Sequence, residues 1–108
     1  MPIQLPKPVA GYVSSGNTSD TEALAACFAS DAVVRDEGHT FNGLEAIKAW
    51  HAEATRNYHH TVEPVEVVKR DGKTILIASV SGDFPNSPVN LEHVFELVDD
   101  KIKSLEIR

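Results

Sequence analysis

Several features of disulfide-bonded, membrane and secreted proteins are missing from this sequence. It has a single cysteine, Cys27, so no disulfide can form within the chain. No run of apolar residues is long enough to span a bilayer, and the first residues lack the basic and apolar segments of a secretion signal. We therefore expect a cytoplasmic protein with no membrane partner.

Positive charge is scarce as well. Lys and Arg number 10 against 16 Asp and Glu, which gives a formal net charge of −6. Such a chain repels phosphate backbones, so nucleic acid is not an expected partner. Apolar residues make up 42% of the chain, which is enough for a core. The length of 108 residues predicts one domain, residues 1–108.

The first part of the chain predicts two helices. Pro2, Pro6 and Pro8 keep the first residues extended, and the last of them suits the first turn of a helix that ends near Gly16. The run Ser19-Asp20-Thr21-Glu22 has the chemistry of a capping box, which predicts a second, short helix directly after it.

A strand follows at residues 31–38, because the segment has a β-branched centre and ends at a glycine. Side chains alternate between the two faces of a strand, so Asp36 shares its face with Ala32 and Val34. Those two residues are small and uncharged. Asp36 is therefore a candidate for burial.

After a turn at residues 38–40, helical spacing of Ile47 and Trp50 predicts the longest helix, over residues 42–57. The pattern then changes to strands at about 59–69, 73–83, 89–98 and 101–107. Asp71-Gly72 is a strong hairpin signal and Asp99-Asp100 a weaker one, whereas two prolines predict a looser loop at residues 85–88.

Helices early in the chain and strands late favour an α+β fold, with a curved antiparallel sheet wrapped over three N-terminal helices. If the sheet curls strongly, the layers do not close everywhere. An apolar pocket then opens between the sheet and the first and third helices.

Two segments carry a resemblance to a known family. The stretch from Gly11 to Asp36 and the segment 41–50, Phe-Asn-Gly-Leu-Glu-Ala-Ile-Lys-Ala-Trp, resemble bacterial ketosteroid isomerases and the wider SnoaL-like group of the nuclear transport factor 2-like superfamily. The resemblance covers nearly the whole chain. It implies a cystatin-like cone with an internal pocket, and a homodimer that pairs through the outer face of the sheet.

The same resemblance implies roles for two residues. In the isomerases, the position matching Asp36 carries the aspartate that moves a proton beside a carbonyl. The position matching Tyr12 carries the tyrosine that hydrogen-bonds the oxyanion. A carboxylate in a dry pocket is a stronger base, and a buried phenol can donate to developing negative charge, so both residue types suit this chemistry.

The resemblance is incomplete at the second oxyanion donor, a protonated aspartate on a late strand of the isomerases. Leu91, His93 and Phe95 alternate on the inward face, and Leu91 or His93 stands near that position. We therefore take Asp36 and Tyr12 as candidate catalytic residues. Candidate ligand-binding residues are Trp50, His93, Leu91 and Phe84.

Each candidate also has a structural interpretation. Asp36 suits a turn or cap, Tyr12 and Trp50 suit core packing, and His93 suits a buried core histidine. We expect no cofactor and no metal, because the neighbouring His59 and His60 would point to opposite faces of a strand.

Two classes of function remain open. The first is an isomerase- or cyclase-like enzyme that transfers a proton next to a carbonyl on a small apolar molecule. The second is a non-catalytic ligand-binding or dimerisation module of the same fold, because one fold hosts many functions.

Overall fold

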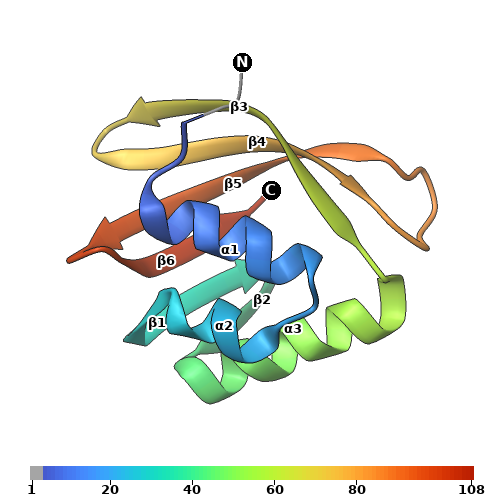
Figure 1. Cartoon of the computed structure of the whole chain (residues 1–108), viewed down its shortest axis with the longest axis horizontal. Helices are drawn as coiled ribbons and strands as arrows, with labels where there is room; N and C mark the ends of the chain where they lie inside the picture. Colours follow the sequence, from blue (N-terminus) through green and yellow to red (C-terminus); the bar gives the residue numbers. More distant parts are fainter. Residues whose placement is uncertain (1–3) are drawn as a thin grey trace.

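The computed structural model describes residues 4–108, so Pro2 lies outside the described residues. Its helices are α1 (Lys7–Asn17), α2 (Thr21–Ala26) and α3 (Leu44–Tyr58). Its strands are β1 (Phe28–Asp36), β2 (His39–Asn42), β3 (Thr61–Arg70), β4 (Lys73–Ser81), β5 (Val89–Val98) and β6 (Lys101–Ile107). In Figure 1 the long strands arch over α1, and α3 runs along β1 and β2.

The predicted α+β class is confirmed: the six strands form one curved sheet in the order β2-β1-β6-β5-β4-β3, with the helices on its inner side. One pairing differs from the expected antiparallel sheet, because β1 runs parallel to β6. These two strands lie far apart in sequence, so no tight turn forces them into opposite directions.

The turn predicted at residues 38–40 lies slightly earlier in the chain, and the strand β2 that follows it was not predicted. Glu37 and Gly38 both have positive φ, 52° and 79°, and form a two-residue turn that pairs Asp36 with His39. Asn-Gly or Asp-Gly is the usual signal of such a turn, and Glu-Gly is not. The turn places Asp36 at the end of β1. The two predicted hairpins, at Asp71-Gly72 and Asp99-Asp100, are confirmed by positive φ at all four residues.

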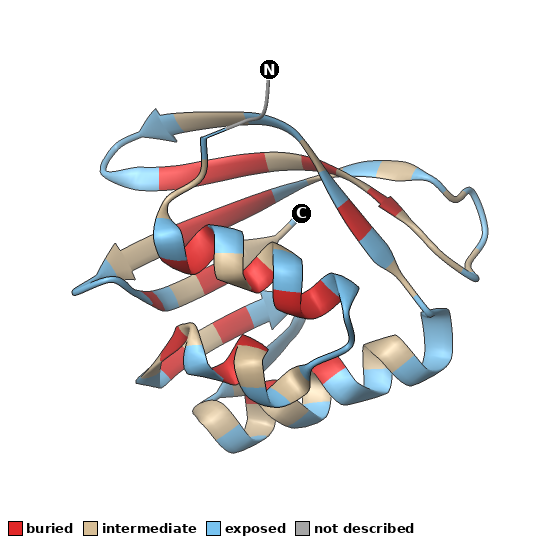
Figure 2. Ribbon diagram, in the orientation of Figure 1, coloured by how far each residue is buried: buried red, intermediate tan, exposed pale blue. Residues whose placement is uncertain are grey.

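The core lies between the inner face of the sheet and the helices, as the red segments in Figure 2 show. The alternation predicted for β1 is confirmed, because Ala32 and Val34 are fully buried on this face. Asp36, the next residue on the face, is half-buried. The inner face of β1 therefore changes from a sealed core at Val34 to partly open space at Asp36, two residues later.

Asn17 fixes the end of α1 to the edge strand β3. Its side-chain Nδ2 donates to the carbonyl oxygen of Val62 at 2.8 Å, and its Oδ1 accepts from the backbone N–H of Val62 at 2.7 Å. The amide thus stands in for a neighbouring strand at an edge whose backbone groups would otherwise lack partners. This pair of bonds sets how far β3 lies from α1.

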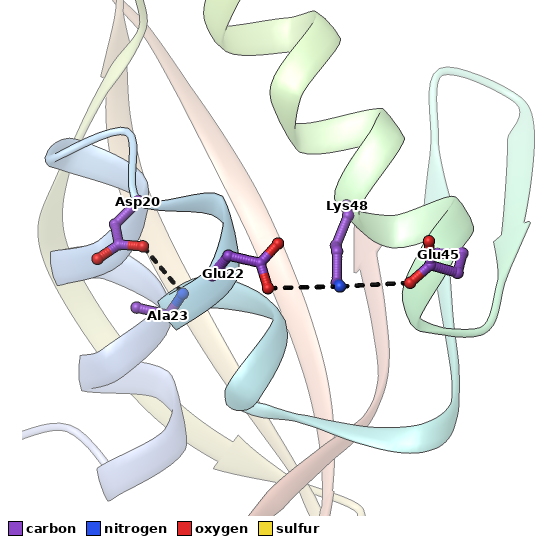
Figure 3. A network of polar contacts seen from close by, with 5 residues as sticks. All are labelled: Asp20, Glu22, Ala23, Glu45 and Lys48. Atoms are coloured by element: carbon purple, nitrogen blue, oxygen red, sulfur yellow. Dashed lines mark hydrogen bonds and ion pairs between the residues drawn. The ribbon is translucent and has the colours of Figure 1, made fainter.

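Polar contacts cap the start of α2 and link it to the first turns of α3 (Figure 3). Asp20 caps α2 by accepting from the backbone N–H of Ala23 at 3.0 Å, which fits the predicted capping chemistry. Lys48 on α3 lies 3.4 Å from Glu22 and 3.3 Å from Glu45. Both carboxylates are exposed, so this bridge contributes little to stability.

Beneath that surface, His51 joins α3 to α2. The residue is 2% exposed, and its Nδ1 lies 3.0 Å from the hydroxyl oxygen of Thr21. Burial first, and then the neighbouring His60, lower the pKa of His51 to about 4. The imidazole is therefore neutral at pH 7.

No helix within residues 4–108 is both long and apolar enough to cross a membrane.

We predict that His51 makes the fold sensitive to acid. In the unfolded chain its pKa returns to about 6.5, so between about pH 6.5 and 4 the unfolded state binds the additional proton and acid favours unfolding. His51→Gln removes this titration. The free energy of unfolding of the native protein should fall relative to the variant by up to about 1.4 kcal/mol per pH unit in that window. Urea unfolding at pH 7 and pH 5 measures the difference, and equal losses in both proteins would contradict it.

Candidate functional site

A cavity of about 950 Å³ lies between the inner face of the sheet, α1 and α3. Its volume suits a small organic ligand. The six candidate residues from the sequence all line it, and they come from α1, β1, α3, β5 and the loop before β5. These residues are Tyr12, Asp36, Trp50, Phe84, Leu91 and His93. The structure therefore brings together side chains that are up to 81 positions apart in the chain.

Asp36 lies at the end of β1, where its carboxylate is held by Trp50. The indole Nε1 of Trp50 donates to Oδ2 of Asp36 at 3.0 Å. An indole N–H can only donate, so this bond leaves the second carboxylate oxygen available for another partner. Among the ion pairs formed by residues 4–108, none involves Asp36.

Tyr12 lies on α1, is 6% exposed and packs among aromatic rings. Its ring centroid is 5.5 Å from that of Phe95 and 6.0 Å from that of His93. Burial, and secondly the negative charge of Asp36, raise the pKa of the Tyr12 hydroxyl well above its ordinary value. The phenol therefore keeps its proton at neutral pH and can act as a hydrogen-bond donor.

His93 lies on β5 and is 2% exposed. Burial is the main cause that lowers its pKa to about 4, so the ring is neutral at pH 7. Its buried Nδ1 has no hydrogen-bond partner within the described part of the chain. That nitrogen is itself buried, so it is an unpaired polar atom behind the cavity wall and not a surface that a ligand can reach.

Sequence reasoning missed His60. This half-buried residue precedes β3 and lines the cavity, and burial is the main cause that lowers the pKa of its imidazole. Its Nδ1 is also unpartnered within residues 4–108. His59 points away to solvent, where its Nδ1 lies 3.0 Å from Asp83. The adjacent histidines do point to opposite sides, and that alternation was the available signal for an inward His60.

Two aromatic residues of the cavity wall were also missed, Phe41 on β2 and Tyr58 at the end of α3. The ring centroid of Phe41 is 6.2 Å from that of Trp50. The ring of Tyr58 stands perpendicular to that of Phe84, with 6.0 Å between centroids. Tyr58 could have been found, because it lies two helical turns beyond Trp50 and near the same face. Phe41 depended on the unexpected strand β2.

The inward face of β5 agrees with the predicted alternation. Leu91 pairs with Ala78, and His93 pairs with Leu76 and Ile107, so both candidates face the cavity side of the sheet. Asn90 is exposed. No carboxylic acid on β5 lines the cavity among the described residues, since its wall acids are Asp36, Glu37 and Glu53. What the site holds is one oriented carboxylate, one protonated phenol and neutral imidazoles.

Comparison with known proteins shows which family this chain resembles. The model of the SnoaL-like domain matches residues 9–105. A proposed polyketide cyclase from Sinorhizobium meliloti is 40% identical, with 96% of this chain and 95% of that chain covered and a TM-score of 0.92. Among proteins with curated functions, none matches the chain.

Two more distant structures show the same fold. A protein with a ketosteroid isomerase-like fold from Catenulispora acidiphila, solved in complex with trimethylamine, is 19% identical, with 97% of this chain and 86% of that chain covered and a TM-score of 0.85. A cystatin-fold protein from Novosphingobium aromaticivorans is 14% identical, with 94% of each chain covered and a TM-score of 0.77. Because the family model spans most of its length, this chain belongs to the SnoaL-like domain family, in the nuclear transport factor 2-like superfamily.

Proposed function

We propose that the protein binds a small, largely apolar molecule in this cavity and transfers a proton next to a carbonyl group, in an isomerase or cyclase reaction. The observation that carries the proposal is the state of Asp36. Its carboxylate lines an aromatic cavity, has one oxygen oriented by Trp50, and forms no ion pair with the described residues. A carboxylate in that setting suits a general base.

The proposed proton transfer needs only side chains that line the cavity. The carboxylate oxygen of Asp36 that Trp50 leaves free takes a proton from the carbon beside the carbonyl, and the electron pair of that C–H bond moves onto the carbonyl oxygen. Tyr12 donates a hydrogen bond to this oxygen, and its raised pKa keeps the phenol protonated. Return of the proton to another carbon gives an isomer. Alternatively, the enolate carbon attacks a second carbonyl and closes a ring, and the new alkoxide oxygen takes the proton that Asp36 holds.

The relative from Sinorhizobium meliloti supports the cyclase form of this chemistry, because it is similar over nearly the whole of both chains. Ring closure by an enolate begins with the same proton removal as isomerisation. A non-catalytic binding role is the second candidate. It is favoured by the absence of an acidic second donor from the part of β5 that lines the cavity, where Leu91 and His93 stand.

We further propose a homodimer formed through the outer face of the sheet. This proposal follows from the resemblance to the SnoaL-like group, because a small domain gains buried area by pairing. Ile75 and Val94 pair across β4 and β5 on the face opposite Leu76 and His93, but they are only 6% and 7% exposed and offer little uncovered apolar surface. A cytoplasmic location likewise remains a prediction.

Asp36→Asn should abolish proton transfer. With a set of β,γ-unsaturated ketones in deuterated buffer, we expect the native protein to exchange deuterium into the carbon beside the carbonyl, and the variant to be at least about 100-fold slower because the amide cannot act as the base. Mass spectrometry measures the exchange. Asp31→Asn makes the same change at an exposed position of β1 and should keep the native rate. No exchange with native protein, or equal rates in the Asp36 variant, would reject the enzyme in favour of the binding module.

Trp50→Phe should slow the exchange roughly tenfold, because it keeps an aromatic ring but removes the hydrogen bond that orients Asp36. If Trp50 acts through Asp36, the double variant Asp36→Asn, Trp50→Phe should be no slower than Asp36→Asn alone. Multiplying losses would show instead that Trp50 has a separate role. Rates of deuterium exchange in all three variants decide between these outcomes.

The homodimer predicts a molecular mass of twice 11.8 kDa in solution. Sedimentation velocity at micromolar concentration measures this directly. A single species at the mass of one chain would contradict the dimer and leave the proposal about the cavity untouched.

A further inference from the structure

The charged side chains that line the cavity carry one sign. Asp36, Glu37 and Glu53 come from the end of β1, the following turn and α3, and no Lys or Arg lines the cavity within residues 4–108. Burial lowers the pKa of both His60 and His93, so neither ring supplies positive charge at neutral pH. A ligand in this cavity therefore meets a negative potential.

Asp36 is the most enclosed of the three acids, and the described part of the chain gives it no cation. The lysine and arginine ion pairs of residues 4–108 do not include Asp36. Lys48 pairs with Glu22 and Glu45, and Arg108 pairs with Glu92. Arg35 follows Val34 on β1 and is exposed on the opposite face of the strand. The single hydrogen bond from Trp50 is therefore the one polar contact that residues 4–108 offer the Asp36 carboxylate. The negative charge of Asp36 therefore stays uncompensated by the described residues and adds to the negative potential of the cavity.

Aromatic rings are concentrated around the same space. Both tyrosines, the single tryptophan and two of the four phenylalanines line the cavity. The perpendicular pair of Tyr58 and Phe84 presents the face of one ring beside the edge of the other. Ring faces attract a cation that lies within about 6 Å of the ring centre, most strongly at tryptophan and tyrosine.

We propose that the cavity selects molecules with an apolar body and one positively charged amine or quaternary ammonium group, and disfavours anions of the same shape. The preference rests on the proposed role of the cavity as a small-molecule site and adds the charge of that molecule. Glu53 lies one helical turn beyond Trp50 on α3, so it places a second negative charge near the aromatic wall. In this arrangement Glu53 contacts the cation and determines specificity.

Three probes with a common phenol body test the charge alone. They carry a trimethylammonium, a tert-butyl or a sulfonate group in the para position. The chain has one tryptophan, whose indole N–H bonds Asp36, so a single indole signal in a proton–nitrogen NMR spectrum reports binding at the site. We expect the ammonium probe to bind about tenfold more tightly than the tert-butyl probe, and the sulfonate to bind about tenfold more weakly. Higher salt should weaken the ammonium probe alone.

Two matched variants show whether the preference comes from the cavity or from net charge. Glu53→Gln should weaken the ammonium probe about fivefold and leave the tert-butyl probe nearly unchanged. Glu63→Gln makes the same charge change at an exposed residue of β3 outside the cavity, and should alter neither affinity.

Equal binding of the ammonium and tert-butyl probes would overturn the proposal, as would equal effects of the Glu53 and Glu63 variants. Failure of every probe to shift the indole signal at about 10 mM would overturn it too, because a cavity of this kind should hold at least one of them weakly. Ammonium selectivity without deuterium exchange would reject the catalytic proposal and support the charge preference. Exchange of neutral ketones without ammonium selectivity would reject the charge preference and support the catalytic proposal.

Discussion

The hydrogen bond from Trp50 to Asp36 joins α3 to the last residue of β1 where the wall of the cavity begins. At this point the two-residue turn of Glu37 and Gly38 reverses the chain, and the parallel partner of Asp36 is Ile107 on β6. Without a donor from α3, a carboxylate beside a turn would be free to rotate toward water. An acid at the end of a strand commonly only anchors a turn. The bond from Trp50 instead orients Asp36 within the aromatic wall of the cavity.

The cavity exists because the helices pack closely against one part of the inner face of the sheet and stand away from another part. Ala32 and Val34 are fully buried on the inner face of β1, whereas Asp36 on the same face is half-buried. The bonds between Asn17 and Val62 hold β3 at the end of α1, so β3 is tied in place rather than free to fold down onto α3. The fold thus forgoes part of the apolar burial that a closed core would provide, and a space for a ligand is the result.

The sequence contained enough local information for most of the fold and for part of the site. Alternation on β1 and β5 was sufficient to place Asp36, Leu91 and His93 on the inner face, because the side-chain period of a strand holds wherever one face is buried. The parallel contact of β1 with β6 and the wall residue Phe41 depend on pairings between segments, which no local pattern encodes. The bond between Trp50 and Asp36 is of the same kind, since it depends on the packing of a helix against a strand.

The two roles proposed for the cavity place opposing demands on Asp36. A cation directly beside its carboxylate would stabilise the ionised form and make the group a weaker base. Proton removal from a cationic substrate therefore requires that the positive charge lie away from Asp36 while the carbon beside the carbonyl lies next to it. Glu53, on another element and nearer to solvent, offers a separate place for that charge. Two acids on two elements, with protonated Tyr12 and neutral His93 in the same wall, can thus bind charge and move a proton without one function cancelling the other.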